Sequence, residues 1–327
     1  MTEPAMADAT LHVVCPNPAL DRLQTVEHFR PFEVNRVTSV RSLPGGKGMI
    51  VCRAARRMDA RVTAHGFAGG AVGRIIRAGC VDLGVADHHV EIAGETRVTP
   101  VVIEQSTGRS TVLNERGPHV SPAEQSALLE GLRSVVRPGD VVVSTGSLPP
   151  GCDGDLHARV ARLAVGAGAL AIVDAHGAAL AAVIDAFRSE PAAGGLVVKP
   201  NALELGEVVG STLHDAEAVL AATQELVAAT GATFVITLGA DGAVWAGRES
   251  WSVAAPRVET VNATGSGDSF LAGLAVALGD DRPAVEALTL ATAMGAANAA
   301  SLTPDVDPVL VRALREDIAV TWHGGAA

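Results

Sequence analysis

Residues 261–270 read VNATGSGDSF and lead into an apolar segment, 269–278, whose large side chains recur at helical spacing. Gly279 follows this segment and is expected to end the helix. Gly265 and Gly267 stand just before it, where they allow close approach of the backbone to a ligand. The first N–H groups of a helix have no partner within it and carry the positive end of its dipole. The stretch therefore predicts an anion-binding turn.

Asp268 places a carboxylate inside the same turn. An acid next to a bound phosphate is unfavourable by itself, because like charges repel. Its position is explained if the carboxylate accepts the proton of a hydroxyl that attacks the phosphate. The alternative is that Asp268 only caps the helix. The residues of the turn alone do not distinguish these two roles.

The composition limits the classes of function. The 327 residues suffice for one large α/β domain with an appendage, or for two domains. A net charge of −11 and the lack of tyrosine argue against binding to nucleic acid or to an anionic membrane. Four scattered cysteines argue against a zinc site and favour a cytoplasmic setting. No apolar run reads as a membrane span, and residues 1–9 are expected to form a loose tail.

Short apolar strands alternate with amphipathic helices along most of the chain. This pattern predicts an α/β fold with a mainly parallel sheet that is covered by helices on both faces. The expected strands are 11–15, 62–66, 141–144, 170–174, 196–199 and 234–238. The expected helices include one that opens with a capping box at 121–124, and further helices at 153–165, 202–209, 215–230 and 284–300.

Two stretches, 22–43 and 92–115, interrupt this alternation with more polar, strand-like sequence. We expect them to form one small sheet that projects from a main domain made of residues 11–21, 44–91 and 116–321. The small sheet fits a lid over an active site, a surface elaboration or a dimer contact. We expect a homodimer that forms through this lid.

Further glycine-rich and polar segments suggest ligand contacts at strand ends. Residues 45–48, GGKG, precede a helix and form a second anion-binding turn, unless Lys47 is simply solvated. Residues 146–151, GSLPPG, follow a strand at the sheet edge where α/β proteins bind ligands, unless they are only a connection. Arg97 is either a phosphate clamp or an exposed strand residue.

Residues 199–204, KPNALE, place Asn201 and Glu204 one helical turn apart. Their oxygens suit a hydrated Mg²⁺, although the same pair also fits a helix cap with glutamate at its third position. No Walker A sequence occurs, which excludes P-loop chemistry. The glycines near residue 70 do not have the dinucleotide-binding spacing.

The order of these motifs resembles the ribokinase-like (PfkB) sugar-kinase family, from about residue 11 to the C-terminal helix. Residues 17–21 (NPALD), 45–48 and 146–151 resemble its 1-phosphofructokinase and tagatose-6-phosphate kinase branch, whose acceptors already carry a phosphate. Residues 264–269, TGSGDS, match the catalytic signature of the family, with Ser266 in place of its usual alanine. The resemblance implies a three-layer α/β sandwich with a small β lid.

The resemblance also implies a reaction and the residues that carry it. ATP would donate its γ-phosphoryl group to a hydroxyl of a sugar phosphate, with Mg²⁺ and a monovalent cation as cofactors. Asp268 would be the base. The resemblance assigns charge stabilisation to Gly265, Ser266 and Gly267; acceptor binding to Asp21, Gly45, Gly46, Lys47, Arg97 and Ser147; nucleotide binding to Lys199, Asn201, Thr237, Gly239, Gly242 and Asn298; and water-mediated magnesium binding to Asn201 and Glu204.

Two positions depart from this branch. Ile50 stands where it usually has an asparagine that touches a sugar hydroxyl, and Thr99 stands where asparagine is frequent. An isoleucine cannot hydrogen-bond a hydroxyl, so we predict that fructose 1-phosphate and tagatose 6-phosphate are poor acceptors. A kinase of a free sugar or nucleoside, and a sugar-phosphate sensor without turnover, are the alternatives. The cationic residues Lys47 and Arg97 favour a phosphorylated acceptor.

Overall fold

The computed structural model describes residues 9–325, so the tail expected at residues 1–9 lies almost wholly outside it. A large central sheet runs through the main body. Its strands follow the order β15 (Val320–Gly325), β14 (Glu249–Val253), β13 (Ala243–Ala246), β12 (Thr233–Thr237), β11 (Leu196–Val198), β10 (Leu170–Asp174), β9 (Val141–Thr145), β1 (Leu11–Cys15), β4 (Val62–Ala68) and β5 (Ala86–Asp87), while β6 (Val90–Glu91) pairs with β4. The strands from β12 to β5 are parallel, and β13 to β15 extend the sheet in antiparallel fashion.

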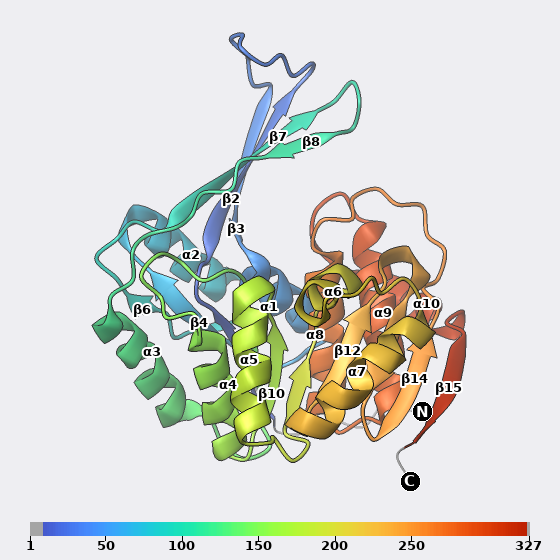
Figure 1. Cartoon of the computed structure of the whole chain (residues 1–327). Coiled ribbons are helices and arrows are strands. Elements are labelled where there is room, and N and C mark those ends of the chain that lie inside the picture. The colour runs from blue at the N-terminus through green and yellow to red at the C-terminus, as the bar shows by residue number, and fades with distance from the viewer. Residues whose placement is uncertain (1–8, 326–327) are drawn as a thin grey trace.

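Helices cover both faces of this sheet and bury two apolar layers (Figure 1). One layer contains residues of α1 (Lys47–Arg57), α2 (Gly70–Asp82), α8 (Ser266–Gly279), α9 (Ala284–Ala299) and α10 (Pro308–Glu316). The other contains residues of α3 (Pro122–Val135), α4 (Leu156–Gly166), α5 (Gly177–Ser189), α6 (Ala202–Val209) and α7 (Ala216–Thr230). The expected three-layer α/β sandwich is confirmed.

A separate four-stranded sheet projects from the main body like a stalk (Figure 1). Its strands are β3 (Ser39–Gly45), β2 (Ala19–Val26), β7 (Arg97–Glu104) and β8 (Ser110–Val112), in that order. They come from the two stretches that interrupt the α/β alternation, with β2 and β7 paired in parallel. The domain boundaries proposed above stay a prediction.

Local signals explain why several elements begin and end where they do. Ser121 caps α3 and forms a capping box with Glu124, because each side chain bonds the backbone N–H of the other residue. Gly231 ends α7 in the left-handed conformation, with a φ of 63°. None of the helices within residues 9–325 is long and apolar enough to cross a membrane.

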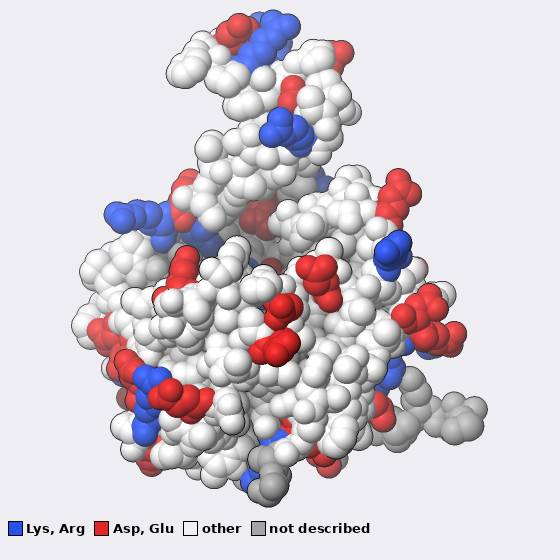
Figure 2. Space-filling model, turned by 45° about the vertical axis from the view of Figure 1, so that its right-hand side comes forward, with Lys and Arg blue, Asp and Glu red and all other residues white. Residues whose placement is uncertain are grey.

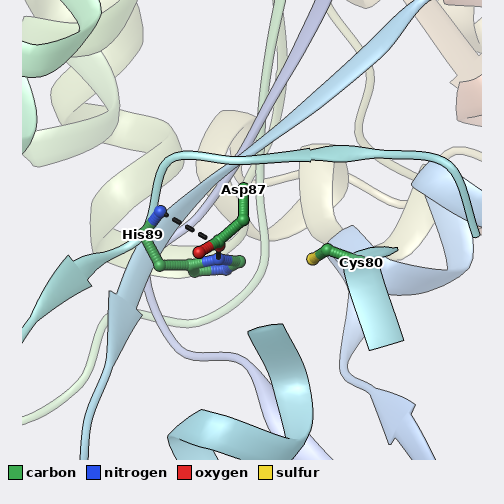
Figure 3. A group of neighbouring side chains, drawn as sticks. All are labelled: Cys80, Asp87 and His89. Atoms are coloured by element: carbon green, nitrogen blue, oxygen red, sulfur yellow. Dashed lines mark hydrogen bonds and ion pairs between the residues drawn. The ribbon is translucent and has the colours of Figure 1, made fainter. Parts of the chain in front are cut away.

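One polar cluster lies at the edge of the sheet, away from the candidate active site described below. Asp87 of β5 accepts a hydrogen bond from the His89 ring at 2.6 Å (Figure 3). Its other carboxylate oxygen accepts one from Arg77 at 2.7 Å. Cys80 lies close to both Asp87 and His89. Both Asp87 oxygens therefore already have partners within the protein. These ion pairs hold β5 and β6 against α2.

Candidate active site

The turn before α8 has the geometry of an anion site. Gly265 is the N-cap of the helix and has a φ of 84°, a conformation that favours glycine. The N–H groups of Gly265 and Gly267 find no hydrogen-bond acceptor within residues 9–325, while that of Ser266 bonds the carbonyl of Ala263. A Cβ added to Gly267 would meet nothing within 4 Å, so the space in front of this residue is open. The turn therefore presents free donors to a ligand.

Asp268 lies at the third position of α8, and the N-cap is Gly265, so the alternative role of Asp268 as the helix cap is wrong. Its side chain is buried and makes no hydrogen bond with any described residue. The pKa of Asp268 is raised to about 7, because burial and the charge of Asp174 raise it by more than Lys47 and Lys199 lower it. A carboxylate with a pKa near neutrality is well matched to proton transfer from a hydroxyl.

Two lysines that were expected at different substrates share one buried carboxylate. Lys47 donates to one oxygen of Asp174 at 3.0 Å, and Lys199 to the other at 3.1 Å. The Thr145 hydroxyl donates to the first oxygen at 2.8 Å. These contacts hold the pKa of the Asp174 carboxyl well below its usual range despite burial, and the Asp174 charge raises the pKa of Lys47.

Asp174 was not among the residues expected in the site. It is the last residue of β10, at the carboxyl end of a parallel strand, where α/β sheets place their ligands. That position was the only sequence signal for it. The bridge through Asp174 joins the GGKG turn at the start of α1 to the KPN segment at the start of α6.

A cavity of about 580 Å³ opens beside the anion site. Thr237, Gly239 and Gly242 line it, as expected for the nucleotide side, and so do Ser266 and Gly267 of the α8 turn. Its other walls come from the apolar residues Ala240, Ala255, Pro256, Val258, Ala263, Phe270, Ala296 and Ala299, together with Arg257, Thr260, Thr292 and Gly295. A largely apolar cavity that includes the anion-binding turn in its wall suits a flat ring system joined to phosphates.

Asn298 was expected to bind the nucleotide, but it does not line this cavity and lies behind the turn. It is fully buried, and its amide nitrogen donates to the carbonyl of Thr264 at 2.9 Å and to the hydroxyl of Ser266 at 3.2 Å. Its oxygen accepts from the Ser269 hydroxyl at 3.1 Å. The side chain therefore fixes the anion-binding turn to α9.

Asn201 and Glu204 form a capping box at the start of α6. The Asn201 oxygen accepts from the N–H of Glu204 at 2.9 Å, and one Glu204 oxygen accepts from the N–H of Asn201 at 2.8 Å. The second carboxylate oxygen of Glu204 has no bond within the described part of the chain. The cap and a water-mediated magnesium contact are thus compatible with each other.

Asp21 of β2, which was expected to bind the acceptor, lies directly against Gly45. A Cβ on Gly45 would come within 2.0 Å of an Asp21 carboxylate oxygen, so only glycine fits there. Burial raises the pKa of Asp21, and the backbone N–H of Gly46 opposes this shift. Figure 2 shows a hollow between the projecting sheet and the main body, in which acidic and basic side chains lie near each other.

Arg97 and Ser147 line a second cavity, of about 690 Å³, at the base of the lid. Both also contact Asn17, a residue of the NPALD segment that was not expected in the site. The Arg97 guanidinium donates to the carbonyl oxygen of Asn17 from Nε at 3.2 Å and from Nη2 at 3.0 Å. The side-chain amide of Asn17 donates to the Ser147 hydroxyl at 3.1 Å. Asn17 thus ties the lid to the loop after β9.

The comparisons with known proteins agree with this geometry. The family model described as pfkB family carbohydrate kinase matches residues 17–305. The chain belongs to this family. Within the pfkB family, it is 34% identical over 271 residues to a 1-phosphofructokinase of Xanthomonas campestris pv. campestris, covering 83% of this chain and 84% of the relative. It is 30% identical over 292 residues to the 1-phosphofructokinase of Bacillus subtilis, covering 89% of this chain and 93% of the relative.

Solved structures of Escherichia coli phosphofructokinase-2 share the fold of this pfkB-family chain. Its complex with fructose-6-phosphate is 26% identical and covers 94% of this chain and 99% of the E. coli chain, with a TM-score of 0.86. The same protein has been solved with potassium, with a TM-score of 0.87, and as a tetrameric inhibited form, with a TM-score of 0.86. The family uses ATP as its phosphoryl donor.

The two departures from the branch lie close to the site. Ile50 in α1 is buried, and two of its methyl carbons would lie 3.4 Å from a Cβ placed on Gly265, so it packs under the anion-binding turn. Thr99 is buried in β7, directly across from Asp21 in the lid sheet. In this pfkB-family chain, the signature turn at residues 264–269 therefore packs against the apolar side chain of Ile50.

Proposed function

We propose that this protein is an ATP-dependent kinase that transfers the γ-phosphoryl group to a hydroxyl of a phosphorylated sugar. The observation that carries the proposal is Asp268, a buried carboxylate with a pKa of about 7 and no hydrogen-bond partner within residues 9–325, beside a turn of free N–H groups. The names of the curated relatives make ketohexose phosphates, fructose 1-phosphate first, the acceptors to test.

In the proposed mechanism, Asp268 accepts the proton of the attacking hydroxyl. The free N–H groups of Gly265 and Gly267 face the transferring phosphoryl group and stabilise the charge that develops on it, whereas the Ser266 N–H, which was expected to do the same, bonds the Ala263 carbonyl. Asp21 orients the acceptor hydroxyls from the lid. Lys47, which bonds Asp174 at 3.0 Å and whose pKa the charges of Asp174 and Asp268 raise despite burial, contacts the phosphate of the acceptor.

ATP would occupy the 580 Å³ cavity, with its phosphates toward Gly267. The donor set at Asn201 and Glu204 fits hydrated Mg²⁺, which would neutralise phosphate charge when bound. Binding of a monovalent cation is part of the proposal because a structural relative has been solved with potassium.

We also propose that two lids pair in a homodimer. Apolar side chains are exposed on the projecting sheet and its tip, namely those of Phe32, Val34, Val37, Val40, Val112 and Leu113. A cluster of exposed apolar residues on one element is typical of a protein interface. Sedimentation of Val40→Asp against wild type tests this pairing, and an unchanged mass would contradict it.

The function is tested with an ATP-consumption assay over fructose 1-phosphate, fructose 6-phosphate, tagatose 6-phosphate, free fructose and a nucleoside, with a blank lacking acceptor. Turnover with a sugar phosphate that is lost in Asp268→Asn supports the proposal. Turnover with a free sugar or nucleoside alone would move the assignment to another acceptor class. Binding without turnover of any acceptor would make the protein a sensor.

A further inference from the structure

Three side chains of the kinds that bind transition metals meet in the polar cluster at the edge of the central sheet (Figure 3). Cys80 offers its sulfur, Asp87 a carboxylate oxygen and His89 a ring nitrogen, and these atoms all lie within 4.8 Å of one another. Among residues 9–325, no second group of three or more histidine, cysteine or acidic side chains meets this condition. The scattered cysteines argued against a zinc site built on cysteine pairs, but this set needs only one cysteine.

Local structure brings the three residues together across a reversal of the chain. Cys80 lies in the last turn of α2. The chain then reverses at Gly84, which has a φ of 65°, and the N–H of Val85 donates to the Cys80 carbonyl at 2.8 Å. Both β5 and β6 pair with β4, so the segment from Asp87 to His89 is extended and these two side chains share a face.

The donor set suits Zn²⁺. Thiolate, imidazole and carboxylate are its usual ligands in proteins, and three of them leave a fourth position for water. The Asp87 oxygen that faces the metal is the one that accepts from Nδ1 of His89 at 2.6 Å, so the metal replaces a shared proton. The other oxygen keeps its bond from Arg77 at 2.7 Å, and such a bond orients a ligating carboxylate. Arg77 also bonds Glu91 at 3.0 Å, which offsets its charge next to the cation.

Burial and charge at the cluster also fit a divalent cation. The His89 side chain is 1% exposed and that of Asp87 is 21% exposed, so solvent reaches the cluster from the Asp87 side. Cys80 is fully buried, and burial and the charge of Asp87 raise the pKa of its thiol to about 12. A bound cation removes the thiol proton. The thiolate and the carboxylate then balance the two positive charges, so no net charge is buried.

We propose that Cys80, Asp87 and His89 bind one Zn²⁺, with water as the fourth ligand, and that this cation fastens the end of α2 to β5 and β6. On binding, the Cys80 thiol releases its proton to solvent and the His89 proton moves from Nδ1 to Nε2; nothing is oxidised or reduced. Residues 92–96 connect β6 to β7, so the cation also fixes the segment that leads into the lid sheet. The site goes beyond the proposed kinase reaction and does not depend on it.

The first test uses Co²⁺, whose complexes with a thiolate have a charge-transfer absorption that identifies the sulfur ligand. The full chain is freed of metals with EDTA, transferred into buffer without chelator, and titrated with Co²⁺ and then with Zn²⁺. Wild type should bind one equivalent of Co²⁺ with a thiolate band, and Zn²⁺ should abolish the band. Cys80→Ala should lose the band, and His89→Gln should weaken Co²⁺ binding at least about tenfold.

The matched controls are Cys52→Ala, which changes another fully buried free cysteine, and His88→Gln, which changes the exposed histidine next to His89. Both should bind Co²⁺ as wild type does. Zn²⁺ at about a hundredfold excess over its Kd should raise the melting temperature of wild type and of both controls by about 4 °C, and that of Cys80→Ala by less than about 1 °C. His89→Gln keeps the proposal falsifiable if Cys80→Ala does not fold.

Three outcomes would overturn the proposal. The first is a thiolate band that Cys80→Ala keeps. The second is a zinc-induced shift in melting temperature without a thiolate band in wild type, which would show binding to histidines elsewhere. The third is neither a band nor a shift in wild type, which would make the cluster an ion-pair network only.

Discussion

Replacing Asp268 by asparagine should make the protein more stable and nearly inactive, and the gain in stability should depend on pH. The folded protein holds the Asp268 pKa at about 7, against an ordinary value of 3.8. Between these values the folded state binds more protons than the unfolded state, so stability falls as the pH rises through this window. The neutral asparagine does not ionise and escapes that loss.

The magnitude follows from the shift. A pKa shift of about three units, at about 1.4 kcal/mol per unit, lowers the free energy of unfolding of wild type by about 4 kcal/mol above pH 7. At pH 5 the same shift lowers it by less than about 2 kcal/mol. A chain of 327 residues has an unfolding entropy of about 0.7 kcal/mol/K. The melting temperature of Asp268→Asn should therefore exceed that of wild type by about 6 °C at pH 8, and by under half of this at pH 5.

The assay is a thermal unfolding series from pH 5 to pH 8.5 on both proteins, with kcat measured in parallel. Loss of the general base should lower kcat by about 10²–10⁴. Asp82→Asn, a change of an exposed aspartate in α2, controls for the general effect of the substitution. A difference in melting temperature that stays flat across the series, or a variant less stable than wild type, would refute the buried-base argument.

Three further predictions concern neighbouring residues. Asp174→Asn should move the acid limb of kcat/KM to lower pH and reduce kcat, because the Asp174 charge raises the pKa of Asp268; an unmoved limb would contradict this coupling. Ile50→Asn should raise kcat/KM on the ketohexose phosphates about tenfold to a hundredfold, with Ile50→Val as control; a wild type already faster than the variant would assign Ile50 to packing alone. Burial lowers the pKa values of His12 and His65, so these residues take up protons on unfolding and stability should fall as the pH drops below about 6.5. His65→Gln should reduce the slope of stability against pH, measured by thermal unfolding, by the equivalent of about one proton, and an equal slope in both proteins would refute this.

The parts of the fold that local sequence determines were predictable. The strand at 170–174 and the helix at 202–209 have the predicted bounds, and the capping box at 121–124 begins α3 as expected. Apolar periodicity and capping residues act within a few positions of the chain, so a single sequence contains them. The small sheet from residues 22–43 and 92–115 was predictable as a break in the alternation.

Pairing between distant segments was not predictable in the same way. The antiparallel strands β13, β14 and β15 were missed, since β14 pairs with residues 320–325 about seventy positions later in the chain. No residue near Trp251 indicates that partner. The Asn17 contacts were missed for the same reason, because the residues that Asn17 holds, such as Ser147, come from loops far along the chain.

The tuning of Asp268 shows why a motif can identify a base without explaining its strength. Burial and the Asp174 charge raise its pKa, and Lys47 and Lys199 lower it. Without Asp174, two unneutralised lysines would depress the pKa and weaken the base; without the lysines, two buried carboxylates would oppose each other's ionisation. The value near 7 therefore depends on a bridge that joins β10, α1 and the end of β11, none of which adjoins Asp268 in sequence.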